Sequence, residues 1–196
     1  FGGAGMTMDY LMLVDSFNAV PDNMDTEFGE LQGKLIEKQA CEQCRLMLEK
    51  AKEDNVHIKI ISGYRTAEYQ QMLWNISVKE AVCQGMPRSE AEKFVSRSLA
   101  FPGHSEHNTG LAIDFGTADA DDVEDDFYKT KQGKWLCKYA HKYGFILRYP
   151  RLKEHITGIC YEPWHYRYVG TEAAGLIRQS GLCLEEFLHF YSEKYI

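Results

Sequence analysis

The sequence predicts an α+β domain in which a central antiparallel sheet has helices packed mainly on one side. Three observations indicate this. The 196 residues suit a single domain with a core of its own. Apolar residues in the first half recur mainly at the three-to-four-residue spacing of helices. The apolar runs of the second half are short and follow closely on one another, which favours antiparallel pairing.

The first elements lie between residues 10 and 61. Residues 10–14 are a short apolar run that is expected to be a strand, and Pro-Asp-Asn at 21–23 favours a turn after it. Residues 34–52 place their apolar side chains on one stripe, which predicts a helix. Residues 56–61 alternate between apolar and polar, so we expect a strand there.

Two helices with polar caps come next. Thr66 is expected to cap a helix that continues to about Val82. Ser89 is expected to cap another, because Glu92 three residues later completes a capping box. Residues 101–108 are rich in polar residues, proline and glycine, so they are interpreted as a loop.

The second half of the chain is predicted to contain most of the sheet. Its two helices are expected at 135–143, where Gly144 ends the first, and at 183–191. Four apolar runs are strand candidates, the last of them the weakest in pattern: 111–115, 145–149, 166–169 and 157–161. The acidic run at 118–126 lacks the glycine and terminal glutamate of a calcium loop. It is interpreted as a solvated loop that could flank an active-site mouth.

Composition excludes several functional classes. A formal net charge of −7 argues against a nucleic-acid binder, which would need a basic face. No stretch reaches the roughly 18 apolar residues of a membrane span. The six cysteines lack the two close pairs of a zinc knuckle, so they are expected to be free thiols that pack as small apolar residues.

Two short polar clusters carry the strongest chemical signal. Residues 105–114 read Ser-Glu-His-Asn-Thr-Gly-Leu-Ala-Ile-Asp, and residues 162–165 read Glu-Pro-Trp-His. A catalytic zinc ion needs three protein ligands from histidine and carboxylate, with one position left open. His107, Asp114 and His165 supply that set.

The neighbours of these three residues support the interpretation. Asp114 would lie inside an apolar strand, where an acid is unfavourable unless something pairs with it, as a metal would. Glu162 precedes His165 by three residues, so it could accept a proton from water without being a ligand. His104 would close the site as a fourth ligand and is therefore interpreted as a loop residue. Arg148 and Arg167 at strand ends could bind a carboxylate or form structural pairs.

The order and spacing of these motifs resemble those of the zinc D-alanyl-D-alanine peptidases, which include VanY carboxypeptidases, VanX dipeptidases and bifunctional VanXY enzymes. The shared pattern is Ser-x-His-x-x-Gly-x-Ala-x-Asp followed by Glu-x-x-Trp-His. The similarity includes Ser-Gly-Tyr-Arg-Thr at 62–66 and Gly-Phe-Ile-Leu-Arg-Tyr-Pro at 144–150. It extends from Leu11 to about Phe187, and so covers most of the chain.

The resemblance implies one zinc ion held by His107, Asp114 and His165. It implies that Glu162 is the catalytic base and that Arg65 stabilises the carbonyl oxygen as it becomes an oxyanion. Four further residues are expected to contact the substrate or wall its pocket by the same resemblance: Ser62, Gln70, Ser105 and Trp164.

One position bears on specificity. VanX-like sequences carry aspartate immediately before Gly-Tyr-Arg, where it can hold the free ammonium of a dipeptide, whereas this chain has Ser62. We therefore expect a D,D-carboxypeptidase that removes the terminal D-Ala of peptidoglycan stem pentapeptides ending in D-Ala-D-Ala, with the ester of D-Ala-D-lactate ends as a further substrate. The alternatives are an L,D-carboxypeptidase acting on tetrapeptides, a bifunctional dipeptidase and carboxypeptidase, and a non-catalytic zinc-containing binding module like hedgehog signalling domains. The presence of Glu162 and Arg65 disfavours the last of these.

Residues 1–10 are interpreted as a leader or tag remnant, because Phe-Gly-Gly-Ala-Gly precedes Met6, and residues 11–196 as the catalytic domain. If Met6 is the native start, the protein is expected to be cytoplasmic. If an upstream anchor has been removed, the domain could work at the outer face of the bacterial cytoplasmic membrane. The sequence leaves open the oligomeric state and the choice between antibiotic resistance and wall maintenance.

Overall fold

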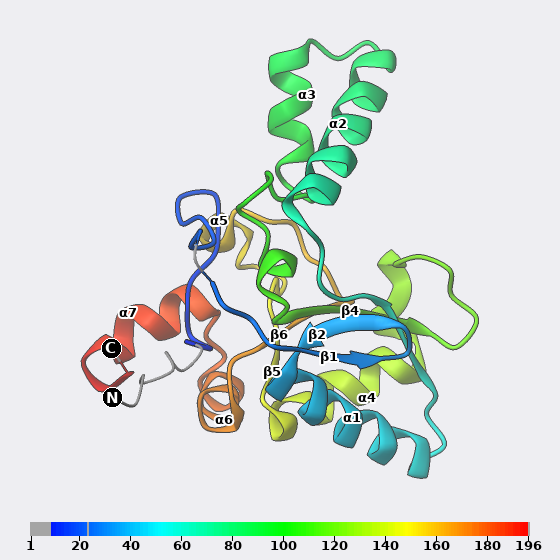
Figure 1. Cartoon of the computed structure of the whole chain (residues 1–196), viewed down its shortest axis with the longest axis vertical. Coiled ribbons are helices and arrows are strands. Elements are labelled where there is room, and N and C mark those ends of the chain that lie inside the picture. Colours follow the sequence, from blue (N-terminus) through cyan, green and yellow to red (C-terminus); the bar gives the residue numbers. More distant parts are fainter. Residues whose placement is uncertain (1–8, 23, 196) are drawn as a thin grey trace.

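The centre of the fold is a four-stranded antiparallel sheet with the strand order β3-β4-β6-β5 (Figure 1). It is seen in a computed structural model that describes residues 9–22 and 24–195. The four strands are β3 (Ile58–Ser62), β4 (Ala112–Thr117), β5 (Phe145–Leu147) and β6 (His165–Tyr168). Each of them overlaps a strand that the sequence predicts, and the α+β class is confirmed.

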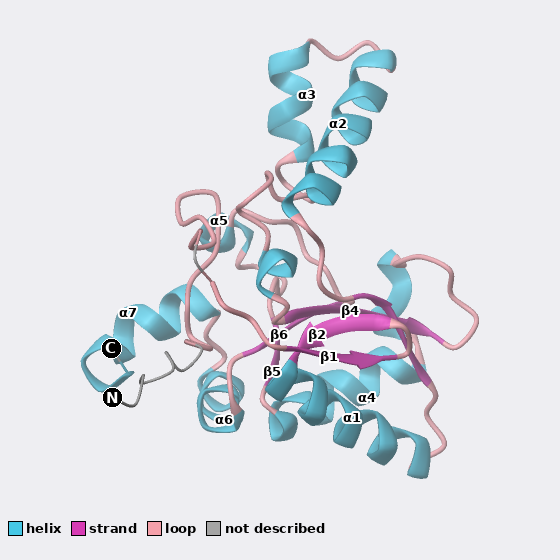
Figure 2. Ribbon diagram, viewed as in Figure 1, coloured by secondary structure: helices cyan, strands magenta, loops and turns pink. Residues whose placement is uncertain are grey.

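One face of this sheet is apolar and packs on two helices. Alternate residues of β4 and β6, such as Phe115 and Tyr166, belong to one buried cluster with residues of α1 (Lys38–Glu53) and α4 (Lys131–Tyr139). Figure 2 shows both helices beneath the sheet. The prediction that helices cover mainly one side is therefore confirmed. Because side chains alternate along a strand, the polar residues of β4 and β6 lie on the opposite face.

Two helices project from that opposite side as a pair, α2 (Ala67–Cys83) and α3 (Arg88–Val95) (Figure 1). Thr66 caps α2 as predicted, since its hydroxyl accepts the Tyr69 N–H at 3.1 Å. The predicted Ser89 cap is wrong. The N-cap is Pro87, two residues earlier, so α3 begins at Arg88, and Glu92 accepts a hydrogen bond from Arg88 at 2.9 Å instead of closing a capping box.

A hairpin replaces the start of the first predicted helix. Strands β1 (Phe28–Leu31) and β2 (Lys34–Glu37) pair antiparallel, and α1 begins only at Lys38. The Glu37 carboxylate accepts the Ala40 N–H at 2.8 Å and so caps this helix. The predicted helix start at residue 34 is wrong, because residues 34–37 pair with 28–31 and form strand β2.

Two other strand predictions are wrong. Residues 10–14 form a turn and extended coil, and the carbonyls of Tyr10 and Met12 accept hydrogen bonds from the Arg167 side chain rather than from a neighbouring strand. The run at 157–161 begins inside the short helix α5 (Glu154–Thr157), which Gly158 ends in the left-handed conformation. The predicted turn at 21–23 includes Asn23, which lies outside the described residues.

The remaining elements are helical. Helix α4 continues as the 3₁₀ helix η3 (Ala140–Tyr143), so the predicted end at Gly144 is confirmed. The 3₁₀ helix η2 (Asp125–Lys129) begins at the end of the acidic run at 118–126. Helices α6 (Thr171–Ser180) and α7 (Leu184–Tyr195) follow the sheet, and the sequence predicted only α7. Within the described chain, no helix is long and apolar enough to cross a membrane.

All six cysteines are free, as predicted, although only Cys41, Cys44 and Cys183 are buried. The leader predicted at 1–10 falls mostly on residues 1–8, which lie outside the described residues. Tyr10 packs edge-on against Tyr168, with ring centroids 5.0 Å apart.

Candidate active site

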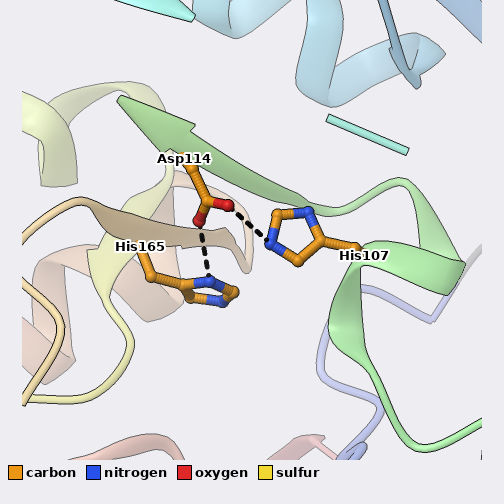
Figure 3. A group of neighbouring side chains, drawn as sticks. All are labelled: His107, Asp114 and His165. Atoms are coloured by element: carbon orange, nitrogen blue, oxygen red, sulfur yellow. Dashed lines mark hydrogen bonds and ion pairs between the residues drawn. The ribbon is translucent and has the colours of Figure 1, made fainter. Parts of the chain in front are cut away.

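The polar face of the sheet brings together the three predicted metal ligands. Asp114 on β4 and His165 on β6 are paired residues in the strand register. His107 comes from the 3₁₀ helix η1 (Glu106–Thr109), which precedes β4. Figure 3 shows the two imidazoles on either side of the Asp114 carboxylate. All three side chains are buried.

Their spacing fits a small tetrahedral ion. Asp114 Oδ2 lies 3.1 Å from His107 Nε2, and Asp114 Oδ1 lies 3.1 Å from His165 Nδ1. One ligand atom from each residue lies within 4.8 Å of the other two. Zinc–nitrogen and zinc–oxygen bonds of about 2.0–2.1 Å in a tetrahedral site place donor atoms roughly 3.3 Å apart. The donor set and its spacing therefore fit zinc.

The protonation of His107 strengthens this fit. Its Nδ1 lies 2.7 Å from the Gly63 carbonyl oxygen, which can only accept, so the ring proton is on Nδ1. Burial, helped by the charge of Arg65, lowers the pKa of His107 despite Asp114, so the ring is neutral. Nε2 and Asp114 Oδ2 thus face each other with lone pairs, and a cation between them would stabilise this arrangement.

The pKa of His165 shifts in the opposite direction to that of His107. Burial opposes its charged form, but hydrogen bonds to Asp114 and Glu106 raise the pKa of His165 to about 9. Burial also opposes ionisation of Asp114, yet the two histidines hold its pKa well below the usual value. The centre therefore favours an added positive charge, which is the property of a cation site.

Gly110 fixes the loop that carries His107. It ends η1 with φ of 78°, a conformation that favours glycine. A Cβ at this position would lie 2.8 Å from Phe28 Cε1 and 3.0 Å from the Glu37 nitrogen. The Glu37 N–H donates to the Gly110 carbonyl at 2.9 Å. The β1–β2 hairpin, which the sequence did not reveal, is thus a direct support of the candidate site.

Arg65 and Ser62 lie beside the three ligands. The Arg65 side chain donates from Nη2 to Asp114 Oδ2 at 2.7 Å and from Nε to Ser62 Oγ at 2.8 Å. A bulge in β3 shifts the register so that Ser62 lies opposite Asp114. Two of the three guanidinium nitrogens therefore hold Arg65 beside the proposed ligands. The third, Nη1, takes no part in these two bonds.

Glu162 is the buried carboxyl that stands next to the cluster. Its Oε2 lies 3.8 Å from His165 Nδ1, and among the described residues no donor makes a closer contact with its carboxylate. Burial raises the pKa of Glu162 to about 8; the charges of Asp114 and Glu106 add to this, while His165 and Arg65 oppose it. A carboxyl without fixed partners and with a pKa near neutrality is suited to accept and return a proton.

These residues open into one cavity of about 790 Å³ that extends toward α2. All the predicted substrate contacts line it: Ser62, Gln70, Ser105 and Trp164. Gln70 is fully buried and donates to the Ala100 carbonyl at 2.8 Å, while its Oε1 has no partner among the described residues. Ser105 Oγ accepts the His107 N–H at 3.3 Å. Asp121 and Asp122 of the acidic run also line the cavity, as the sequence suggested.

Comparison with known families decides what kind of protein carries this arrangement. Residues 33–171 match the family model described as VanY: D-alanyl-D-alanine carboxypeptidase. The chain belongs to the VanY family. The match contains all the metal-ligand, base and substrate-contact residues that the sequence predicted.

Individual relatives agree with the VanY assignment. The chain is 38% identical over 180 residues to a D-alanyl-D-alanine carboxypeptidase of Enterococcus faecalis, covering 91% of this chain and 65% of the relative. A VanY D,D-pentapeptidase from a VanB-type resistance cassette, solved in complex with Zn(II), aligns with a TM-score of 0.83 at 37% identity and covers 92% of this chain and 99% of the other. The LD-carboxypeptidase LdcB aligns with a TM-score of 0.77 at 35% identity, and the alignment covers 92% of this chain and 86% of the other. The chain thus spans about 65% of the length of the E. faecalis relative.

Glu106 is a residue of this candidate site that the sequence did not reveal, and the structure decides the roles of Arg148 and Arg167, which the sequence left open. Glu106 is 2% exposed, and its Oε2 lies 3.4 Å from His165 Nε2. Arg148 and Arg167, which could have bound a carboxylate or formed structural pairs, both donate to Glu106 Oε1 at 2.7 Å. Burial opposes ionisation of Glu106, but the two arginines and His165 hold its pKa well below the usual value. His104 is outside the cluster, and its Nδ1 lies 2.7 Å from the Asp15 carbonyl, as expected for a loop residue.

Proposed function

We propose that this chain is a zinc-dependent D,D-carboxypeptidase that removes the terminal D-Ala from peptidoglycan stem pentapeptides. The observation that carries the proposal is the convergence of His107, Asp114 and His165 beside the buried carboxyl of Glu162, in one cavity. Membership of the VanY family supports the same activity. The VanY pentapeptidase solved with Zn(II) supports the choice of metal.

His107, Asp114 and His165 would hold the zinc ion, and all three line the cavity. Zinc, when bound there, supplies Lewis-acid polarisation of the scissile carbonyl and activation of the attacking water. The protein supplies the donor orientation: the Gly63 carbonyl fixes the His107 ring, and the strand register fixes Asp114 beside His165.

Glu162 would act as the base and then as the acid. Its carboxylate takes a proton from the attacking water as the oxygen bonds to the carbonyl carbon of the penultimate D-Ala. It then delivers that proton to the amide nitrogen as the C–N bond breaks, so that D-alanine leaves with a neutral amine. Arg65 would stabilise the negative charge that develops on the carbonyl oxygen.

The cavity wall would hold the peptide. Gln70 lines the cavity and its Oε1 has no partner among the described residues; a substrate backbone N–H would reach this buried acceptor only after the side chain moves toward the cavity. Trp164 supplies an apolar wall. Ser62 places a hydroxyl, not a carboxylate, at the position beside Arg65, which favours a longer peptide over the free ammonium of a dipeptide.

A comparison of three substrates tests the proposed specificity. The zinc-loaded protein is given a stem pentapeptide ending in D-Ala-D-Ala, the corresponding tetrapeptide, and the free dipeptide D-Ala-D-Ala, and products are identified by mass spectrometry. The proposal expects the highest kcat/KM for the pentapeptide. Preferred cleavage of the tetrapeptide would replace it with an L,D-carboxypeptidase, an outcome that the similarity to LdcB makes worth measuring. Preferred cleavage of the dipeptide would contradict the inference from Ser62.

A further inference from the structure

We propose that Glu106 is a positioning residue that selects the metal-binding tautomer of His165 and that a buried charge network reaching α7 holds it in place. The inference rests on the zinc site proposed above. Glu106, Arg148 and Arg167 would act through His165 and are not among the proposed metal ligands.

The two carboxylate oxygens of Glu106 contact different partners. Oε1 accepts two charged hydrogen bonds, from Arg148 Nε and Arg167 Nη1, both at 2.7 Å. Oε2 is left for His165 Nε2, which lies 3.4 Å away. Because the arginines fix the carboxylate through one oxygen, the direction of the other is fixed as well.

Both ring nitrogens of His165 face a carboxylate, Nδ1 that of Asp114 at 3.1 Å and Nε2 that of Glu106 at 3.4 Å, so with a metal on the Asp114 side Glu106 is the acceptor left for the ring proton. The ionised carboxylate of Glu106 can only accept, so it favours the tautomer with hydrogen on Nε2. The Nδ1 lone pair then faces Asp114 Oδ1 at 3.1 Å, on the side of the proposed metal. His107 is oriented by the same logic with the nitrogens exchanged, since the Gly63 carbonyl holds its Nδ1. Such partners on the second ring nitrogen commonly tune histidine ligands.

The arginines are themselves held from outside the cluster. Arg148 makes a two-bond contact with Glu185 on α7, at 2.9 Å from Nη1 and 2.8 Å from Nη2. Arg167 Nη2 donates to the carbonyls of Tyr10 and Met12 at 3.1 and 2.8 Å. Both guanidinium groups are completely buried.

The formal charges of the two arginines and the two glutamates in this network sum to zero without His165. Two arginines face the carboxylates of Glu106 and Glu185, and the Glu106 side chain is also completely buried. The Glu106 carboxylate is therefore paired with and held in place by the arginines, independently of its contact with His165. Glu185, Tyr10 and Met12 all lie outside the family match at 33–171, so segments beyond the matched region support the metal ligand.

Zinc affinity of three variants tests the proposal, measured by competition with a chromophoric chelator on protein shown to be folded by circular dichroism. Glu106→Gln is expected to bind zinc roughly 10–100-fold more weakly than the wild type, the usual effect of removing such a partner. Glu185→Gln, which leaves Glu106 in place but frees Arg148, is expected to show a smaller loss. Glu186→Gln is the matched control, because Glu186 is the next residue on α7 and pairs with Lys153 at 2.8 Å instead of with Arg148. Its zinc affinity is expected to equal that of the wild type.

A second measurement needs no variant and decides the case if Glu106→Gln does not fold. Nitrogen-15 NMR of the zinc-loaded wild type should show His165 protonated on Nε2, with slow exchange of that proton. Wild-type zinc affinity in folded Glu106→Gln, or a His165 proton on Nδ1, would overturn this inference and leave the proposed function standing. Failure of the wild type to bind zinc would overturn both.

Discussion

Asp114 and His165 are register partners on β4 and β6, and their side chains meet on the polar face of the sheet with Asp114 Oδ1 3.1 Å from His165 Nδ1. The same carboxylate presents its other oxygen to His107. One short strand pair thus places two of the three proposed zinc ligands, while the opposite face of the same strands contributes to the core. Pairing of β4 with β6 therefore also assembles two of the three proposed ligands, and η1 adds the third.

The first prediction concerns Asp114. Asp114→Asn keeps the shape of the side chain but removes the charge that both histidines face, so zinc affinity should fall by at least about tenfold. Equilibrium dialysis followed by metal analysis checks this. Full zinc occupancy at wild-type affinity in the variant would remove Asp114 from the ligand set.

The second prediction separates the proposed base from the ligands. Glu162→Gln should retain zinc at wild-type affinity, yet lose about 10²–10⁴-fold in kcat, because a positioned general base contributes that much. Metal content and turnover are measured on the same sample. A variant that stays fully active would refute the base assignment, and one that loses its zinc would make Glu162 a ligand.

The third prediction concerns Arg65. Arg65→Met should lower kcat by about 10²–10³-fold, the effect of removing one preorganised partner of a developing oxyanion. Arg65→Lys should recover only part of the loss, because an ammonium cannot keep bonds to both Ser62 and Asp114. A rise in KM with unchanged kcat would instead show that Arg65 binds ground state and transition state equally.

The fourth prediction uses two glycines with the same backbone conformation. Gly110 and Gly158 have φ of 78° and 74°, but only Gly110 has neighbours within 4 Å of an added Cβ. Gly158→Ala should destabilise the protein by about 1–2 kcal/mol through the left-handed conformation alone. Gly110→Ala should lower the free energy of unfolding by roughly 1–3 kcal/mol more, because the added Cβ overpacks against Phe28 and the backbone of Glu37. Urea unfolding at one fixed zinc concentration measures both, and equal losses would show that the hairpin contact is unimportant.

The candidate metal centre could be proposed from sequence because its residues lie in two compact motifs with distinctive spacing. Asp114 is conspicuous as an acid in an apolar strand, and His165 and Glu162 lie within four residues of each other. The strands of the central sheet were equally visible, since the alternation at 56–61 and the short apolar run at 111–115 are local patterns.

What the sequence did not reveal depends on contacts between distant residues. Glu106 is a single acid in a polar loop, and its partners Arg148 and Arg167 are 42 and 61 residues away. The β1–β2 hairpin was missed because the apolar spacing of 34–37 also fits a helix, and only pairing with 28–31 distinguishes the two. At 10–14, backbone carbonyls bond to a buried arginine side chain, which no local pattern predicts.

The measurement that tests the central claim most directly is D-alanine release from a stem pentapeptide ending in D-Ala-D-Ala, before and after treatment with a zinc chelator and after zinc is added back. The account predicts release that the chelator abolishes and that zinc restores. Undiminished release from protein shown to be free of metal, or no release from the zinc-loaded protein, would contradict it.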